Sequence, residues 1–140
     1  MGFLFKFRQN FKRSQQFDLV KKQTPLERGL EAEEEAMQWL KSHGLQLLAR
    51  NYRTRLGEID LIMRDQNEVV FVEVRLRLSK IYAPAAETIV LRKQQRIQKA
   101  AEHYLQRFHS STLPNCRFDV MASDGKSWQW IKHAFTAQTN

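Results

Sequence analysis

The chain alternates between segments in which apolar residues recur with a helical period and segments with the two-residue period of strands. Residues 25–42 are predicted to form a helix that Thr24 caps and that ends at residues 43–44, His-Gly. A longer helix is expected from about Glu87 to Phe108. Strands are predicted over residues 45–52, 57–63, 68–76, 116–122 and 127–131.

The order of these elements, α-β-β-β-α-β-β, predicts an α/β fold with a mixed sheet of about five strands flanked by helices. Residues 69–72, Val-Val-Phe-Val, are apolar on both faces, which predicts a central, covered strand. Residues 25–140 are expected to form a single domain. Residues 1–24 are interpreted as a basic, Phe-rich N-terminal extension, for which disorder stays an open interpretation.

Two acidic residues precede the turn of the predicted hairpin at residues 64–68, and one acidic and one basic residue follow it. Because side chains alternate faces along a strand, Glu58 and Asp60 share one face, and Glu73 shares a face with Arg75. Glu73 continues the line of buried residues of its strand, so it is expected to emerge from the interior at a sheet end. The hairpin could bring all four side chains together. The alternative is that they are ordinary solvent-facing residues of a half-buried hairpin.

The first helix carries a carboxylate on its apolar side. Leu30, Met37 and Leu40 form an apolar stripe at 100° per residue, and Glu33 lies in its middle. A core-facing carboxylate is costly unless it is paired, hydrogen-bonded or bound to a metal. Glu33 is therefore a candidate site residue, with an ion pair to a nearby arginine as the alternative.

The second helix is predicted to bury one side and to expose a basic one. The predicted buried side consists of Ile97, Ala101, Tyr104 and Phe108. A basic stripe follows another face, through Arg92, Arg96, Lys99, His103 and Arg107. Such a stripe could track a phosphate backbone, although a plain solvated face explains it nearly as well. Lys93 lies near the apolar side and is expected to point toward the sheet end.

The net charge of +8 is concentrated at the start of the chain, where residues 1–28 carry an excess of five positive charges. This favours a polyanionic partner, because neutralised phosphates release counterions. There are two alternatives: residues 1–24 contact an anionic membrane surface, or they form a tail without a dedicated partner.

The chain has no stretch near the roughly 18 apolar residues of a transmembrane helix and no secretory signal, so a cytoplasmic protein is expected. The single cysteine excludes an internal disulfide.

Five short motifs occur in order along the chain. They are Gly29-x-x-x-Glu33-x-x-Ala36, Arg50-Asn51-Tyr52-Arg53, Gly57-Glu58-Ile59-Asp60-Leu61-Ile62, Phe71-Val72-Glu73-Val74-Arg75 and Arg117-Phe118-Asp119-Val120. With them, about residues 26–135 resemble the YraN-like family of small bacterial proteins. That family looks like a branch of the PD-(D/E)xK restriction-endonuclease-like superfamily, similar to archaeal Holliday-junction resolvases. The resemblance implies a restriction-endonuclease-like core and metal-dependent cleavage of DNA as the ancestral activity.

The resemblance also assigns roles to individual residues. Glu33 matches the helix carboxylate of the superfamily, and Asp60 and Glu73 match its two strand acids. These three would hold Mg²⁺ or Mn²⁺, while Glu58 would support the site from outside the ligand set. Arg75 would complete the catalytic set at the position usually held by lysine. Because a guanidinium stays protonated, Arg75 could stabilise a transition state but could not act as a general base.

The leading hypothesis is a metal-dependent nuclease that hydrolyses phosphodiester bonds in structured DNA, with a homodimer as one possible form. The expected nucleic-acid-binding residues are Arg53, Arg77, Arg92, Lys93, Arg96 and Lys99. One alternative is a nucleic-acid-binding protein of nuclease ancestry that has lost turnover. Another is a peripheral adaptor that docks on a membrane or a protein through residues 1–24.

Overall fold

The computed structural model describes residues 21–77 and 89–137 of the chain. Within these ranges the elements are α2 (Pro25–Ser42), β1 (Gln46–Arg53), β2 (Glu58–Asp65), β3 (Glu68–Leu76), α3 (Leu91–Phe108), β4 (Asn115–Ser123) and β5 (Trp128–Phe135). Residues 1–20 of the predicted N-terminal extension and the predicted helix start at Glu87 lie outside the described residues. No helix in the described ranges has the length and apolar character needed to cross a membrane.

The limits of α2 follow from its terminal residues. The Thr24 side chain accepts a hydrogen bond from the Glu27 N–H at 3.2 Å, and the Thr24 N–H donates to the Glu27 carboxylate at 2.7 Å. These reciprocal bonds satisfy backbone groups that a first helical turn leaves without intrahelical partners. At the other end Gly44 has φ +93°, a left-handed conformation that glycine adopts without steric cost. The predicted limits of this helix are confirmed.

The five strands form one sheet whose spatial order follows the chain, β1-β2-β3-β4-β5. Neighbouring strands are antiparallel except β3 and β4, which run parallel and are connected through α3. A parallel pair needs such a crossover, because a tight turn can join only antiparallel strands. β3 is therefore the central strand, as its apolar run predicts.

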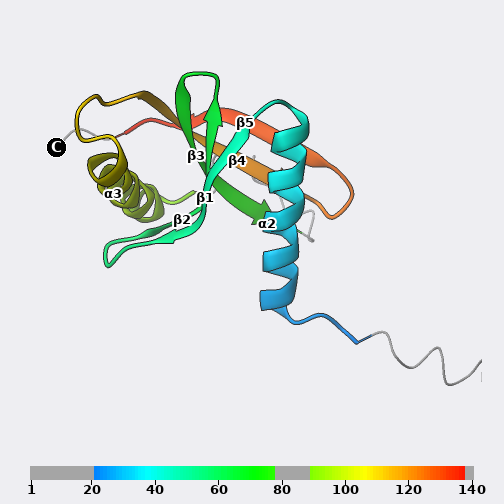
Figure 1. Ribbon diagram of the computed structural model, residues 1–140. Helices are drawn as coiled ribbons and strands as arrows, with labels where there is room; N and C mark the ends of the chain where they lie inside the picture. The colour runs from blue at the N-terminus through cyan, green and yellow to red at the C-terminus, as the bar shows by residue number, and fades with distance from the viewer. Residues whose placement is uncertain (1–20, 78–88, 138–140) are drawn as a thin grey trace, which may run out of the picture.

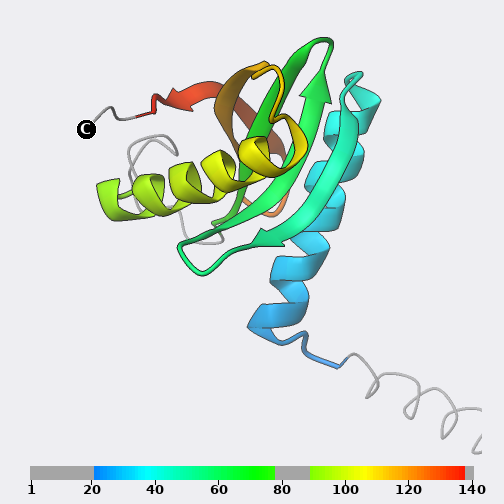
Figure 2. The same cartoon turned by 60° about the vertical axis from the view of Figure 1, so that its left-hand side comes forward.

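The two helices cover opposite faces of the sheet (Figures 1 and 2). On one face Val70 and Val72 of β3 pack with Met37 and Leu40 of α2. On the other face Phe71 packs with residues of α3, among them Ile97. Both faces of β3 are thus buried, which explains why its sequence is a continuous apolar run. The α/β fold and the restriction-endonuclease-like core with a mixed five-stranded sheet are confirmed.

Three details of the sequence prediction are wrong. Residues 89 and 90, which the prediction included in the second helix, precede α3, and Ile89 is buried near Val120 of β4. Leu30 is 48% exposed, because the first turns of α2 extend past the sheet (Figure 1). Phe108, the last residue of α3, is 55% exposed and contacts Tyr104 by its ring. Apolar periodicity identifies the side of a helix that can be buried, but not how far along the helix the sheet reaches.

A buried ionic cluster ties the β2–β3 turn to β4. Arg117 of β4 donates to Asp65 at 2.9 Å and to Glu68 at 2.7 Å, on the two sides of that turn. Its Nε also contacts both carboxylate oxygens of Asp119, which is fully buried. Trp130 of β5 donates its indole N–H to the same carboxylate at 2.9 Å. The Arg117–Val120 motif therefore has a structural role at the end of the sheet.

Candidate active site

The strands β2 and β3 part at Asp60. Their pairing runs from Asp65↔Glu68 at the turn to Leu61↔Val72. At the next position the Asp60 carboxylate accepts a hydrogen bond from the backbone N–H of Val74, with a donor–acceptor distance of 2.8 Å. A side chain thus takes a hydrogen bond that the ladder would otherwise make, which fixes the carboxylate between the two strands. Glu73, only 7% exposed, lies beside it on β3.

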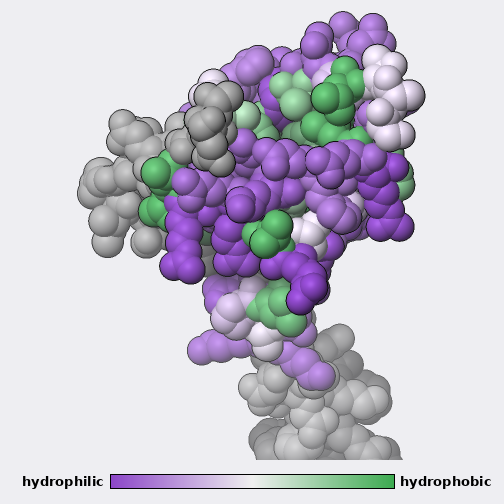
Figure 3. All heavy atoms as spheres, turned by 90° about the vertical axis from the view of Figure 1, so that its left-hand side faces the viewer, coloured by the Kyte–Doolittle hydropathy of each residue, from purple (hydrophilic) through white to green (hydrophobic). Residues whose placement is uncertain are grey.

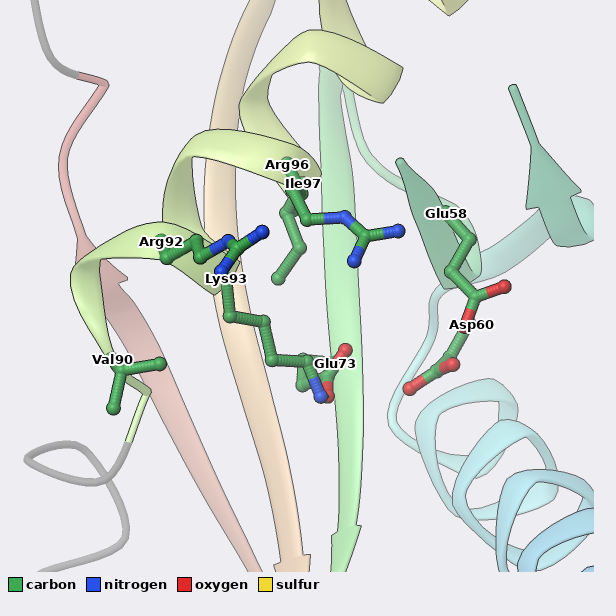
Figure 4. Close-up of a pocket in the computed structure, with 8 residues that line it drawn as sticks. All are labelled: Glu58, Asp60, Glu73, Val90, Arg92, Lys93, Arg96 and Ile97. Carbon is green, nitrogen blue, oxygen red and sulfur yellow. The ribbon is translucent and has the colours of Figure 1, made fainter. Parts of the chain in front are cut away.

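These acids line a pocket of about 260 Å³ between the sheet and the start of α3. One wall consists of Glu58, Asp60 and Glu73 from β2 and β3. The opposite wall comes from α3 and the residue before it, with Val90, Arg92, Lys93, Arg96 and Ile97. Figure 4 shows the basic side chains of the helix extending toward the strand acids. The predicted convergence of Glu58, Asp60 and Glu73 is present.

A close backbone contact holds the two walls together. Gly57 precedes β2, and a Cβ atom on it would lie 2.0 Å from the carbonyl oxygen of Arg96 in α3. The turn before it is closed by Thr54, whose N–H donates to the Gly57 carbonyl at 2.8 Å. Only glycine permits this approach, because any side chain would push the turn away from the helix. Gly57 therefore sets the separation between Glu58 and the helix cations.

The two neighbouring acids of the pocket influence each other electrostatically. Burial, followed by the negative charge of Glu73, raises the pKa of Asp60 to about 7, against the hydrogen bond from the Val74 N–H, which lowers it. Glu73 forms an ion pair with Lys93 across the pocket. Two adjacent carboxylates in a buried position cannot both be charged without compensation. The pair can be neutralised by protonation, by Lys93 or by a metal ion.

Glu33 of α2 lies near this pair but outside the lining of the pocket. Its Oε2 atom is buried and has no hydrogen-bond partner. Burial raises the pKa of Glu33, as does the charge of Asp60, whereas a hydrogen bond with Asn51 lowers it. A buried oxygen without a partner is rare in folded proteins and calls for an explanation such as an ion. The orientation of Glu33 toward the core is as predicted from the helical stripe.

Among residues 21–77 and 89–137, no three His, Cys, Asp or Glu side chains gather closely enough to form a metal centre. The available donors nevertheless suit a hard divalent cation, because all of them are carboxylate oxygens. Mg²⁺ commonly binds through one or two carboxylates and completes its coordination with water and substrate phosphates. Asp60 and Glu73 meet this requirement, whereas Glu33 lies near them without completing a three-acid centre.

The predicted basic residues divide into two groups. Arg92, Lys93 and Arg96 line the pocket, and Lys99 is exposed one turn farther along α3. The others do not line the pocket: Arg53 lies beside it, 3.7 Å from the carboxylate of Glu58 in its wall, and the Arg77 backbone is bonded to Ser123 of β4. Arg75 is outside the pocket lining, and burial followed by the charge of Arg77 lowers its pKa, against the charge of Glu73.

Asn51 is a site residue whose role the sequence did not reveal. Its side chain lowers the pKa of Glu33, and its backbone is left-handed with φ +46°. Asparagine tolerates this conformation better than most residues. An asparagine inside a predicted strand was the available signal, since it is depleted there.

Comparison with known proteins identifies the family of the chain. The model of the uncharacterised protein family UPF0102 matches residues 32–122, which include every acid of the pocket. A UPF0102 protein of Alkalilimnicola ehrlichii is 49% identical over 112 residues, covering 80% of this chain and 89% of the relative. One of Klebsiella pneumoniae is 49% identical over 104 residues, covering 74% of this chain and 81% of the relative. The similarity inferred from the sequence motifs is confirmed, and the chain belongs to the uncharacterised protein family UPF0102.

Proposed function

We propose that this protein is a metal-dependent nuclease that hydrolyses phosphodiester bonds in structured DNA. The observation that carries the proposal is the pocket in which two adjacent carboxylates, the half-buried Asp60 and the buried Glu73, face a basic helix. Phosphodiester hydrolysis needs negative charge to hold a divalent cation and positive charge to hold the substrate. The pocket presents both on opposite walls.

Residues in the pocket and beside it have distinct parts in this proposal. Asp60 and Glu73 would hold Mg²⁺ or Mn²⁺, with Glu33 as a further donor. The ion would supply a bound water of lowered pKa and neutralise charge on the phosphate. Arg92 and Arg96 would bind and orient the phosphate, because planar guanidinium groups match its oxygens in pairs. Arg75 would contribute charge to the transition state without accepting a proton.

The surface around the pocket suits a polyanion. Arg92, Arg96 and Lys99 are exposed along α3, so the basic stripe continues outside the pocket. The face that α3 occupies carries a broad hydrophilic band (Figure 3). Lysine and arginine contacts to phosphates release counterions, so binding should weaken steeply as salt rises.

The test is cleavage of a labelled four-way junction, a duplex and a single strand by the purified chain in Mg²⁺ or Mn²⁺. The proposal predicts metal-dependent nicking, fastest on the junction and lost in Asp60→Asn and Glu73→Gln. Both variants keep the size of the side chain, and circular dichroism would verify that they are folded. Retained cleavage in folded variants would contradict the assignment of these acids.

The second candidate is a nucleic-acid-binding protein without turnover. It is favoured by the arginine at position 75 and by the absence of a three-acid cluster in the part of the chain that the structure describes. It predicts salt-sensitive binding to DNA while every substrate stays intact in either metal. Removing the basic residues of α3 would then weaken binding, whereas Asp60→Asn would not.

A further inference from the structure

Lys93 reaches from the exposed side of α3 to a buried acid. Its ammonium forms an ion pair with Glu73, although the lysine side chain is 47% exposed and that of Glu73 only 7%. The position of the residue on the helix is fixed, because its N–H donates to Val90 at 2.9 Å and Ile97 is buried one turn later. Figure 4 shows the long side chain running from the helix down to Glu73.

The cation that forms an ion pair with Glu73 therefore comes from the helix. Arg75 follows Glu73 by two residues on β3, but it does not line the pocket. A lysine ammonium is a compact charge on a flexible stem, so it can move between nearby partners more readily than a guanidinium. The half-exposed side chain of Lys93 has room for such a movement.

We propose that Lys93 is the resident counter-ion of the Asp60–Glu73 pair and moves from Glu73 to a substrate phosphate when a divalent cation binds. The inference rests on the proposed function, because it requires that this pair receives the metal. In the metal-free protein the ammonium compensates a buried charge that would otherwise be costly. A divalent cation at the same carboxylates would repel it. Arg92 and Arg96 flank its path, so the released ammonium would join the group that binds the phosphate.

The first experiment is calorimetric titration of Mn²⁺ into the full chain, wild type and Lys93→Met. It is run at about pH 8, so that protons do not compete for Asp60, whose pKa is about 7. We expect Lys93→Met to bind Mn²⁺ about tenfold more tightly, since coupled ligands commonly affect each other ~5–150-fold. Lys93→Arg retains the positive charge and should bind Mn²⁺ nearly as the wild type does. It also serves as the folded reference if Lys93→Met proves unstable.

The second experiment measures the salt dependence of binding to a DNA junction, without a divalent cation and then with Ca²⁺ in place of Mg²⁺. The logarithm of the binding constant falls linearly with the logarithm of the salt concentration, and the loss of one phosphate contact lowers the magnitude of this slope by about 1. Lys93→Met should show this reduction only in Ca²⁺, because without metal the lysine is engaged by Glu73. Arg92→Met is the matched control and should lower the slope in both conditions.

The outcomes separate the inference from the proposed function. Equal Mn²⁺ affinity in wild type and Lys93→Met, or a slope change that is the same with and without Ca²⁺, overturns the exchange and leaves the nuclease proposal standing. If neither protein binds Mn²⁺, both the exchange and the metal-dependent function are overturned. Tighter Mn²⁺ binding together with a slope change confined to Ca²⁺ supports the exchange.

Discussion

Gly57 and Arg96 are in backbone contact: a Cβ atom at position 57 would lie 2.0 Å from the Arg96 carbonyl oxygen. Gly57 precedes the strand that carries Glu58 and Asp60, and Arg96 belongs to the helix that carries Lys93. The contact therefore sets the width of the candidate site. A backbone atom cannot move aside as a side-chain end can, so this glycine is a sensitive position for both stability and site geometry.

The first prediction concerns Gly57→Ala. The added methyl group must displace either the turn or the helix, which should lower the free energy of unfolding by about 1–3 kcal/mol. Urea denaturation would measure the change. Gly29→Ala is the matched control, because a Cβ there meets no atom within 4 Å and lies within helix α2. That substitution should instead stabilise by about 0.5–1 kcal/mol. Equal effects of the two substitutions would contradict the contact.

The second prediction concerns the pH dependence of stability. The pKa of Asp60 is raised from 3.8 to about 7, so the folded state binds its proton more tightly than the unfolded state does. The contribution of Asp60 is therefore fully present below pH 3.8 and is lost as pH rises through about 7. Asparagine does not titrate and can still accept the Val74 N–H. Asp60→Asn should gain stability relative to wild type, more at about pH 8 than at pH 5.

Urea unfolding of both proteins at the two pH values would check this difference. Asp124→Asn is a useful contrast. Hydrogen bonds from Ser127 and Lys126 lower the pKa of Asp124, which is an exposed turn residue. The sign is therefore opposite: a lowered pKa contributes stability that is lost as pH falls. A gain for Asp60→Asn that is independent of pH would show that the carboxyl does not titrate in this range.

The third prediction concerns the buried ionic cluster at the far end of the sheet. Arg117→Met would leave the fully buried Asp119 without its guanidinium partner. Breaking a buried pair on one side should cost about 3–5 kcal/mol of unfolding free energy. Arg53→Met makes the same chemical change in an exposed pair with Glu58, 3.7 Å long, and should cost less than about 1 kcal/mol. Thermal or urea unfolding compares them directly.

The fourth prediction ranks two cations in the proposed cleavage reaction. Lys93 lines the pocket and Arg75 does not, so Lys93→Met should reduce kcat more than Arg75→Met does. Removing one electrostatic stabiliser of a transition state typically costs ~10²–10³-fold in kcat, and we expect this range for Lys93→Met. Single-turnover cleavage at saturating protein separates this effect from weakened DNA binding. A larger loss of kcat in Arg75→Met than in Lys93→Met would instead assign the main electrostatic role to Arg75 of β3.

The sequence predicted the local structure well because local signals are sufficient for it. The Thr24–Glu27 capping box and Gly44 set the limits of α2 through backbone hydrogen bonds and φ. The apolar run of β3 marked it as the central strand, since both of its faces had to be buried. The helical angle placed Glu33 on the core side, and its buried oxygen agrees with that position.

Only the tertiary structure decided which cation forms the ion pair with Glu73. The spacing along β3 makes Arg75 the neighbour of Glu73 in sequence, yet the ion pair of Glu73 is made by Lys93. That partner depends on how α3 lies across the sheet, which the Gly57–Arg96 contact and the packing of Ile97 determine. The buried side of an element can be predicted from periodicity, because periodicity depends only on a few neighbouring residues. The distance between two elements is a property of everything packed between them, and no single segment of the sequence contains it.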